Sequence, residues 1–280
     1  MKRNFFQLTN LRIEVSFKSL QELRSILSFY QQNNIYKINI PCKGDLKKDF
    51  LLDAIKTSRE EFPDIDLIPH FSILHEFKRN RVNTLNSLIQ FLQTAKQLGC
   101  NNVLLVSGSQ KRSTLDTVSS LEFLKNNTLL FNRDFSIGVA FNPYLPIDLF
   151  EDELIKLEKK VKSGLVTSIW IQFGTDSNLL EQRVKILKKI TDSAENSKSR
   201  KFKIKLFGSV LVPSKQFISR FKYRPWKGVY CSDKFLESVK EAENLVIKLV
   251  KTYKNFKITP IIETDVCSEK KLKSLVNLLK

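Results

Sequence analysis

Short apolar runs typical of buried strands alternate with amphipathic helical patterns along almost all of this 280-residue chain. Eight runs have the character of strands: Arg12 to Phe17, Ile35 to Ile40, Ile65 to Pro69, Asn102 to Val106, Ser136 to Ala140, Ser168 to Phe173, Phe202 to Val212 and Lys257 to Ile262. Helical patterns, with apolar residues three and four apart, include Leu20 to Tyr30, Val82 to Leu98, Glu151 to Ser163, Leu179 to Ser193, Ser238 to Tyr253 and Glu269 to Leu279. This alternation favours one α/β domain over residues 1–280, a single (β/α)8 TIM barrel, over a doubly wound sheet.

Other local signals fix where elements end. Gly99 and Gly164 follow helical patterns directly, as glycines do at helix C-termini. The most polar stretch, Asp192 to Arg200, predicts an exposed loop before the seventh strand, and the irregular pattern from Phe221 to Ser238 predicts a longer excursion.

The formal charge of +18 comes from lysines and arginines spread over nearly every helical pattern. A nucleic-acid site would gather them in one tract with interleaved aromatic residues, so this spread indicates a solvated surface, and we expect no nucleic-acid partner.

No apolar run approaches the roughly 18 residues of a membrane span, and none follows the basic start as in a signal peptide. We therefore expect a soluble, cytoplasmic protein without a membrane partner.

The cysteines and histidines argue against a metal centre. Four cysteines lie far apart without a C-x-x-C pair, and there are only two histidines, His70 and His75. This pattern predicts buried or incidental thiols, without a disulfide framework or a metal site.

Polar residues close three of the strand candidates. His70 follows Pro69, Ser107-Gly108 follows Val106, and Gln172 lies in the end of the sixth candidate, ahead of Asp176. Because the carboxyl ends of the strands face the ligand in a parallel barrel, these residues predict one site at that mouth.

Five segments, in the same order along the chain, carry a resemblance to a known family. Pro69-His70-Phe71-Ser72 is similar to a Pro-His-Leu-Thr segment, and Asn102 to Val106 is similar to an Asn-Ile-Leu-Ala-Leu strand. Gly138 to Pro143 resembles a Val-Ala-x-Tyr-Pro turn, and Leu157 to Gly164 resembles a Leu-Lys-x-Lys-Val-Asp-Ala-Gly helix end. With Gln172 and the Asp four residues on, the chain resembles the methylenetetrahydrofolate reductase family over most of its length.

The resemblance implies an FAD-linked oxidoreductase of one-carbon (folate) metabolism, with NAD(P)H as the electron donor and a folate-type small molecule as the substrate. It further implies that Gln172 orients the folate pterin, while other residues hold the flavin or line its edge: His70, Ser107, Gly108, Ser109, Ala140 and Asn142.

Two departures from the family concern its carboxylates. The family's first strand ends in Ser-Phe-Glu, where the Glu is the proton donor, but here Lys18 follows Ser16-Phe17 and occupies the catalytic position. The family's flavin-site Arg-Gly-Asp is replaced by Ser107-Gly108-Ser109. Glu14 shares a strand face with Lys18 but lies about 13 Å deeper at ~3.3 Å per residue, so we interpret it as a group of the barrel interior.

Several alternatives stay open on sequence alone. His70 is either a flavin contact or a satisfied core histidine, and Asp176 either acts at the site or caps the next helix. The turn from Ser107 to Arg112 suits cofactor phosphates but is also an ordinary polar loop. The whole chain is either a divergent reductase of weak activity or a non-catalytic folate-binding or regulatory homologue, as a homo-oligomer or paired with an active reductase. An unrelated barrel enzyme acting on a phosphorylated metabolite is a third reading.

Overall fold

The computed structural model describes residues 11–42, 48–76, 80–108, 115–127, 135–196 and 203–279. Within these ranges, eight parallel strands pair in sequence order, and β1 pairs with β8 to close a barrel. The strands are β1 (Arg12–Glu14), β2 (Lys37–Ile40), β3 (Asp66–Ser72), β4 (Asn102–Val106), β5 (Ser136–Phe141), β6 (Val166–Ile171), β7 (Lys205–Val210) and β8 (Thr259–Ile262). The prediction of one parallel (β/α)8 barrel is confirmed.

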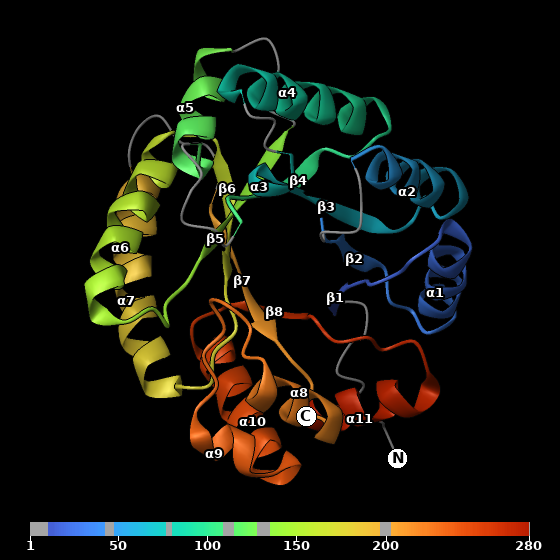
Figure 1. Ribbon diagram of the computed structural model, residues 1–280, viewed down its shortest axis with the longest axis vertical. Coiled ribbons are helices and arrows are strands. Elements are labelled where there is room, and N and C mark those ends of the chain that lie inside the picture. Colours follow the sequence, from blue (N-terminus) through green and yellow to red (C-terminus); the bar gives the residue numbers. More distant parts are fainter. Residues whose placement is uncertain are drawn as a thin grey trace.

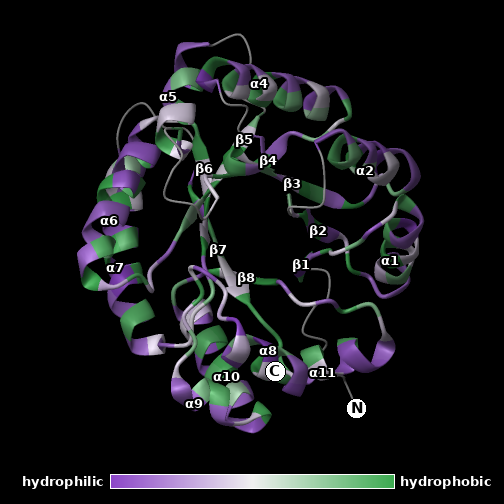
Figure 2. Cartoon of the chain, in the orientation of Figure 1, coloured by the Kyte–Doolittle hydropathy of each residue, from purple (hydrophilic) through white to green (hydrophobic). Residues whose placement is uncertain are grey.

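The helices form a ring outside the strands (Figure 1). They are α1 (Leu20–Gln32), α2 (Lys48–Glu61), α3 (Ile73–Glu76), α4 (Arg81–Gln97), α5 (Thr117–Asn126), α6 (Ile147–Lys162), α7 (Ser177–Glu195), α8 (Lys215–Tyr223), α9 (Asp233–Glu237), α10 (Val239–Asn255) and α11 (Glu269–Leu279). Figure 2 shows hydrophilic and hydrophobic residues alternating along them, as expected of helices with one face on a barrel. Among the described residues, no helix combines the length and the apolar character that crossing a membrane requires.

Several boundaries differ from the sequence prediction; for example, β1 ends at Glu14 and not at Phe17, and β7 spans Lys205–Val210 and not Phe202 to Val212. β3 continues past Pro69 to Ser72, so His70 lies within the strand and does not follow it. Pro69 lacks a backbone donor where β2 ends at Ile40, and the strand continues because its last three residues pair with β4. The loop predicted from Asp192 is wrong at its start, because α7 runs to Glu195, and residues 197–202 lie outside the described chain.

The predicted helix ends are confirmed. Gly99 and Gly164 have φ values of +76° and +80°, the left-handed conformation that ends a helix at low cost only for glycine. Asp176 caps α7, since its carboxylate accepts from the N–H groups of Asn178 at 3.0 Å and Leu179 at 2.9 Å. Of the two roles that the sequence left open for Asp176, the structure therefore has the helix cap.

An apolar layer fills the middle of the barrel. Trp170 stacks on Phe207 with ring centroids 4.1 Å apart and planes 12° apart. Trp170 also packs in one buried cluster with Ile68, Leu104 and Ile261. The polar residues on the inward face of the strands therefore lie in two groups, one at each end of the barrel.

The thiols are free and poorly reactive by environment. Cys100 is buried, while Cys42, Cys231 and Cys267 are partly buried, and none is in a disulfide. Burial raises the pKa of Cys100 to about 11 and the pKa of Cys231 and Cys267 to about 12. At neutral pH these groups are thiols, which are weak nucleophiles.

We expect Gly208→Ala to destabilise the protein, because β7 meets the ring of Tyr253 at this glycine. A β-carbon at position 208 would overlap the Tyr253 ring, which is fully buried and donates its hydroxyl to the carbonyl of Ser209 at 3.0 Å. Overpacking of this kind costs about 1–3 kcal/mol of unfolding free energy. Urea denaturation measures it, and adding Tyr253→Leu should recover part of the loss; a wild-type midpoint for Gly208→Ala would contradict the close approach.

Candidate functional site

The carboxyl-end mouth of the barrel carries a polar group on the inward strand faces. Glu14, Asn39 and His70 lie two residues beyond Arg12, Lys37 and Ile68, the inward residues nearer the other end of β1, β2 and β3. Beside Glu14 around the barrel, since β8 pairs with β1, the carboxylate of Glu263 just past β8 accepts a hydrogen bond from the hydroxyl of Ser209 in β7. Both groups are built from residues distant in sequence.

A buried chain of hydrogen bonds links His70 to the other end of the barrel. The Arg12 guanidinium donates to Asn39 Oδ1 at 3.1 Å, and Asn39 Nδ2 lies 2.8 Å from His70 Nε2. His70 Nδ1 is 4.0 Å from Glu14 Oε2. Asn39 is fully buried and the His70 residue is 9% exposed, so water competes little for these contacts.

The network fixes the tautomer of His70. A guanidinium only donates, so the Asn39 atom facing Arg12 is the carbonyl oxygen, and the amide NH2 faces His70. His70 Nε2 is therefore the acceptor, and the ring proton sits on Nδ1, on the side of Glu14. Protonating Nε2 would set two donors against each other, so the hydrogen bond from Asn39 favours the neutral imidazole.

Arg12 anchors this network. The same guanidinium nitrogen donates to the Ile38 carbonyl at 2.8 Å and the Asp66 carbonyl at 3.3 Å, and the other terminal nitrogen is paired with the Asp66 carboxylate. Burial lowers the pKa of Arg12, and the Asp66 charge opposes that effect, which leaves the guanidinium a cation. Its Nε is buried without a hydrogen-bond partner in the described chain.

Gln172 and Ala140 present accessible surface at the mouth. Gln172 lies two residues beyond Trp170 and is partly exposed; its backbone N–H donates to Phe141, and its amide makes no hydrogen bond within the described part of the chain. Ala140 is exposed, although both of its neighbours in β5 are fully buried. An exposed residue on the inward face of a barrel strand marks an accessible space.

Other residues singled out from the sequence have structural roles. The Ser107 hydroxyl is 2.6 Å from that of Thr117 and accepts its N–H, which ties β4 to α5. Asn142 donates to the Gly228 carbonyl at 2.9 Å and accepts from the Tyr144 N–H at 3.0 Å. Both side chains are engaged in loop contacts, which weakens their assignment to a cofactor.

The remaining site residues predicted from the sequence are Lys18, Gly108 and Ser109. Lys18 is exposed, and its N–H donates to Glu22 at the start of α1. Gly108 has a φ of +86° and packs so closely on Leu74 that a β-carbon would overlap it. Ser109 lies outside the described residues. The structure thus brings His70 together with Glu14, and it places Lys18 in solvent, away from a buried acid position.

Sequence reasoning missed Asn39, the central member of the network. Its signal was one amide between Ile38 and Ile40 in an apolar run, which marks a buried polar group that needs partners. The Glu14 interpretation as an interior group agrees with a side chain that is 11% exposed.

The residues at the mouth are compatible with a flat cofactor such as a flavin. Ala140 leaves the β5 side open, while the fixed ring of His70 and the Gln172 amide offer polar contacts from neighbouring parts of the mouth. Among the described residues there is no group of three or more histidine, cysteine, aspartate or glutamate side chains placed to hold a metal ion.

Comparison with known proteins supports the fold only. No protein-family profile and no curated protein matches the sequence. Among solved structures, a candidate phosphonomutase from Burkholderia cenocepacia J2315 is similar with a TM-score of 0.54 and 7% identity, covering 96% of this chain and 93% of that one. A candidate 2,5-diketo-D-gluconic acid reductase B aligns with a TM-score of 0.49 and 11% identity over 96% of this chain and 82% of that one.

Proposed function

We propose that this protein is a divergent methylenetetrahydrofolate reductase-like, FAD-linked oxidoreductase whose ligands bind at the carboxyl-end mouth. The observation that carries the proposal is the neutral, oriented His70 in a mouth that is open at Ala140. The sequence resemblance places these two residues at the flavin and Gln172 at the folate pterin, and the structure supports the proposal by leaving the Gln172 amide without a hydrogen bond in the described chain.

The chain would supply position and electrostatics, and FAD would supply hydride transfer from NAD(P)H to the folate. His70 would donate to the flavin edge from Nδ1. It would accept a hydrogen bond from the flavin only after a change in its contacts, because Nε2 already accepts from Asn39. Ala140 leaves space beside the ring, and its carbonyl is held by the buried Lys160 ammonium at 2.9 Å. Gly108, just past β4, packs against Leu74.

A non-catalytic folate-binding homologue is the second candidate, and the exposure of Lys18 favours it. A lysine acts as an acid near neutral pH only if burial or a nearby cation lowers its pKa. Lys18 is exposed and follows a strand that ends at Glu14, so the described structure does not bury it. We therefore expect weak or absent reductase turnover even where flavin binds.

Purified full-length protein distinguishes the candidates. Flavin absorbance and NAD(P)H oxidation with a folate acceptor would support a reductase. Colourless protein that binds a reduced folate would support the homologue. Protein with neither property would overturn both.

Gln172→Leu should weaken folate binding roughly tenfold or more, because it removes hydrogen bonds worth about 1–3 kcal/mol to a buried ligand. The fold should be unaffected, since the Gln172 amide bonds to nothing in the described chain. Calorimetry gives the affinity, and Gln97→Leu, an exposed position on α4, is the matched control. Equal folate affinities in Gln172→Leu and wild type would remove Gln172 from the site.

A further inference from the structure

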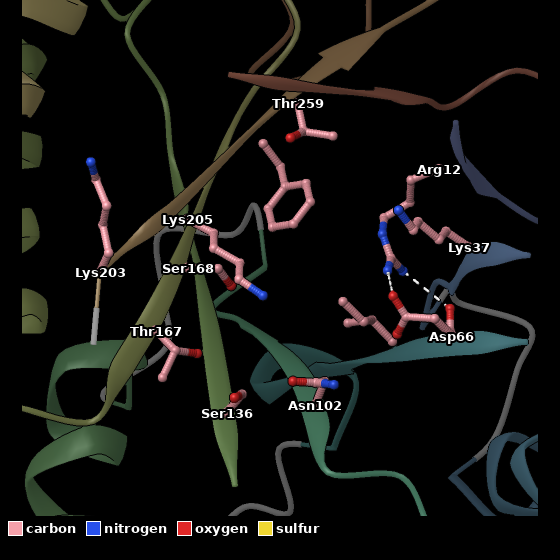
Figure 3. A pocket seen from close by; sticks show the side chains of 12 residues that line it. Arg12, Lys37, Asp66, Asn102, Ser136, Thr167, Ser168, Lys203, Lys205 and Thr259 are labelled. Carbon is pink, nitrogen blue, oxygen red and sulfur yellow. Dashed lines mark hydrogen bonds and ion pairs between the residues drawn. The ribbon is translucent and has the colours of Figure 1, made fainter. Parts of the chain in front are cut away.

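A cavity of about 470 Å³ opens at the amino-terminal end of the barrel, on the side opposite the mouth. The first residue of every strand except β6 lines it, so the strand starts converge on one space (Figure 3). The apolar layer around Trp170 and Phe207 lies between this cavity and the mouth. The two spaces are therefore separate potential sites.

The cavity wall is strongly cationic. Arg12, Lys37, Lys203 and Lys205 line it together with one acidic residue, Asp66, so the formal net charge is +3. In Figure 3 the Lys205 side chain runs inward past Ser168, whereas Lys203 points away at the edge. Low-dielectric walls strengthen the field of such charges on an anion.

Neutral donors face the same space. The Asn102 amide and the Ser136 hydroxyl line the cavity, and neither makes a side-chain hydrogen bond within the described chain. Together with the Lys205 ammonium they offer the donors that phosphate oxygens accept. Arg12 adds a guanidinium that is 3% exposed and already oriented by Asp66, which spares the cost of ordering it on binding.

The size and the apolar lining set the class of ligand. Cavities of ~300–1,000 Å³ bind small organic molecules, so this one exceeds the needs of a bare phosphate ion. Ile68 and Phe207 provide apolar contact beside the cations. If the organic part of a small phosphorylated ligand packed on these two side chains, its phosphate group would face Lys205.

We propose that the amino-end cavity binds a small phosphorylated metabolite through its phosphate group. Lys205, Asn102 and Ser136 contact the phosphate, and Arg12 contributes charge from the wall. Asp66 limits the affinity because its carboxylate repels the anion. This site is independent of the proposed folate chemistry at the mouth, and either one can fail without the other.

Calorimetric titration of the full-length protein with pyrophosphate and with inorganic phosphate, at constant ionic strength in chloride, tests the proposal. Wild type should bind pyrophosphate, and Lys205→Met should weaken that binding roughly tenfold or more, because it removes a charge-assisted hydrogen bond. Asp66→Asn should tighten it severalfold, since the amide oxygen can still accept from Arg12 while the negative charge is gone.

Lys215→Met is the matched control, because it removes the same charge from an exposed lysine on α8 that does not line the cavity. Melting temperatures identify any variant that has lost its fold, and Ser136→Ala then serves as a second, milder test with weaker pyrophosphate binding expected. The proposal is overturned if wild type binds neither anion at millimolar concentration. Equal weakening by Lys205→Met and Lys215→Met, or weaker binding in Asp66→Asn, would overturn it as well.

Discussion

Arg12→Met should lower the free energy of unfolding by about 3–5 kcal/mol, the largest stability effect we expect from one substitution. The guanidinium donates to Asn39 Oδ1 and to the Ile38 and Asp66 carbonyls, and it pairs with the Asp66 carboxylate. Methionine fills similar volume but donates nothing, so buried acceptors lose a partner at about 1–3 kcal/mol each.

Arg24→Met is the matched control for this prediction. Arg24 also binds a carboxylate, that of Glu61, through three hydrogen bonds of 2.7–2.9 Å. The side chains of Arg24 and Glu61 are both about half exposed, so water replaces the lost contacts and the effect should be much smaller. Urea denaturation of the two variants gives the comparison. Similar losses in both would show that the Arg12 network adds nothing beyond an ordinary surface ion pair.

Much of the fold is encoded locally, and this explains why it could be predicted from the sequence. All eight strands and the helix ends at Gly99 and Gly164 follow from apolar patterning and glycine conformation, which need no knowledge of distant residues. The end of β3 was wrong because a proline usually stops a strand, whereas pairing of His70 with Leu104 of β4 extends it.

The site was harder to predict, because its contacts depend on strand register. Arg12 meets Asn39 and Asp66 only because β1, β2 and β3 pair so that these side chains share the barrel interior. No local pattern carries that register across 54 residues. Ser107 and Asn142 show the converse difficulty, since their residue types suit a ligand but their hydrogen bonds join loops and helices.

The amino-end cavity was missed for a related reason. The spread of lysines along the sequence predicts a solvated surface, and nothing in it indicates that Lys37 and Lys205, far apart along the chain, begin strands of one barrel. Charge counted along a sequence describes composition, whereas closure of the barrel decides which charges share a space.

Asn39→Asp should convert His70 from a neutral acceptor into a donor, the largest change we expect at the mouth. An aspartate at position 39 accepts from Arg12 as the asparagine does, but it presents a second acceptor oxygen to His70 Nε2 where the amide NH2 now donates. The imidazole then binds a proton on Nε2 while Nδ1–H still faces Glu14. A carboxylate this close should raise the midpoint of the His70 titration relative to wild type, because a neighbouring negative charge favours the imidazolium.

The sign of the stability effect follows from linkage. A histidine that binds its proton more tightly in the folded state adds stability below the pKa of about 6.5 of the unfolded chain, and it loses that stability as pH rises through the folded-state value. Asn39→Asp should therefore gain stability relative to wild type on going from pH 8 to pH 5. Asn244→Asp, an exposed substitution on α10 with the same charge change, should not.

Nitrogen-15 NMR of labelled histidine measures the protonation directly, because the chain has only two histidines and His75 is exposed. His75→Gln assigns the remaining signal to His70. Wild type should show the neutral tautomer with the proton on Nδ1, and Asn39→Asp should show Nε2 protonated. A wild-type signal from a neutral ring protonated on Nε2 would reverse the direction of the Asn39 bond, and with it the argument that the network holds His70 ready at the mouth as a neutral group.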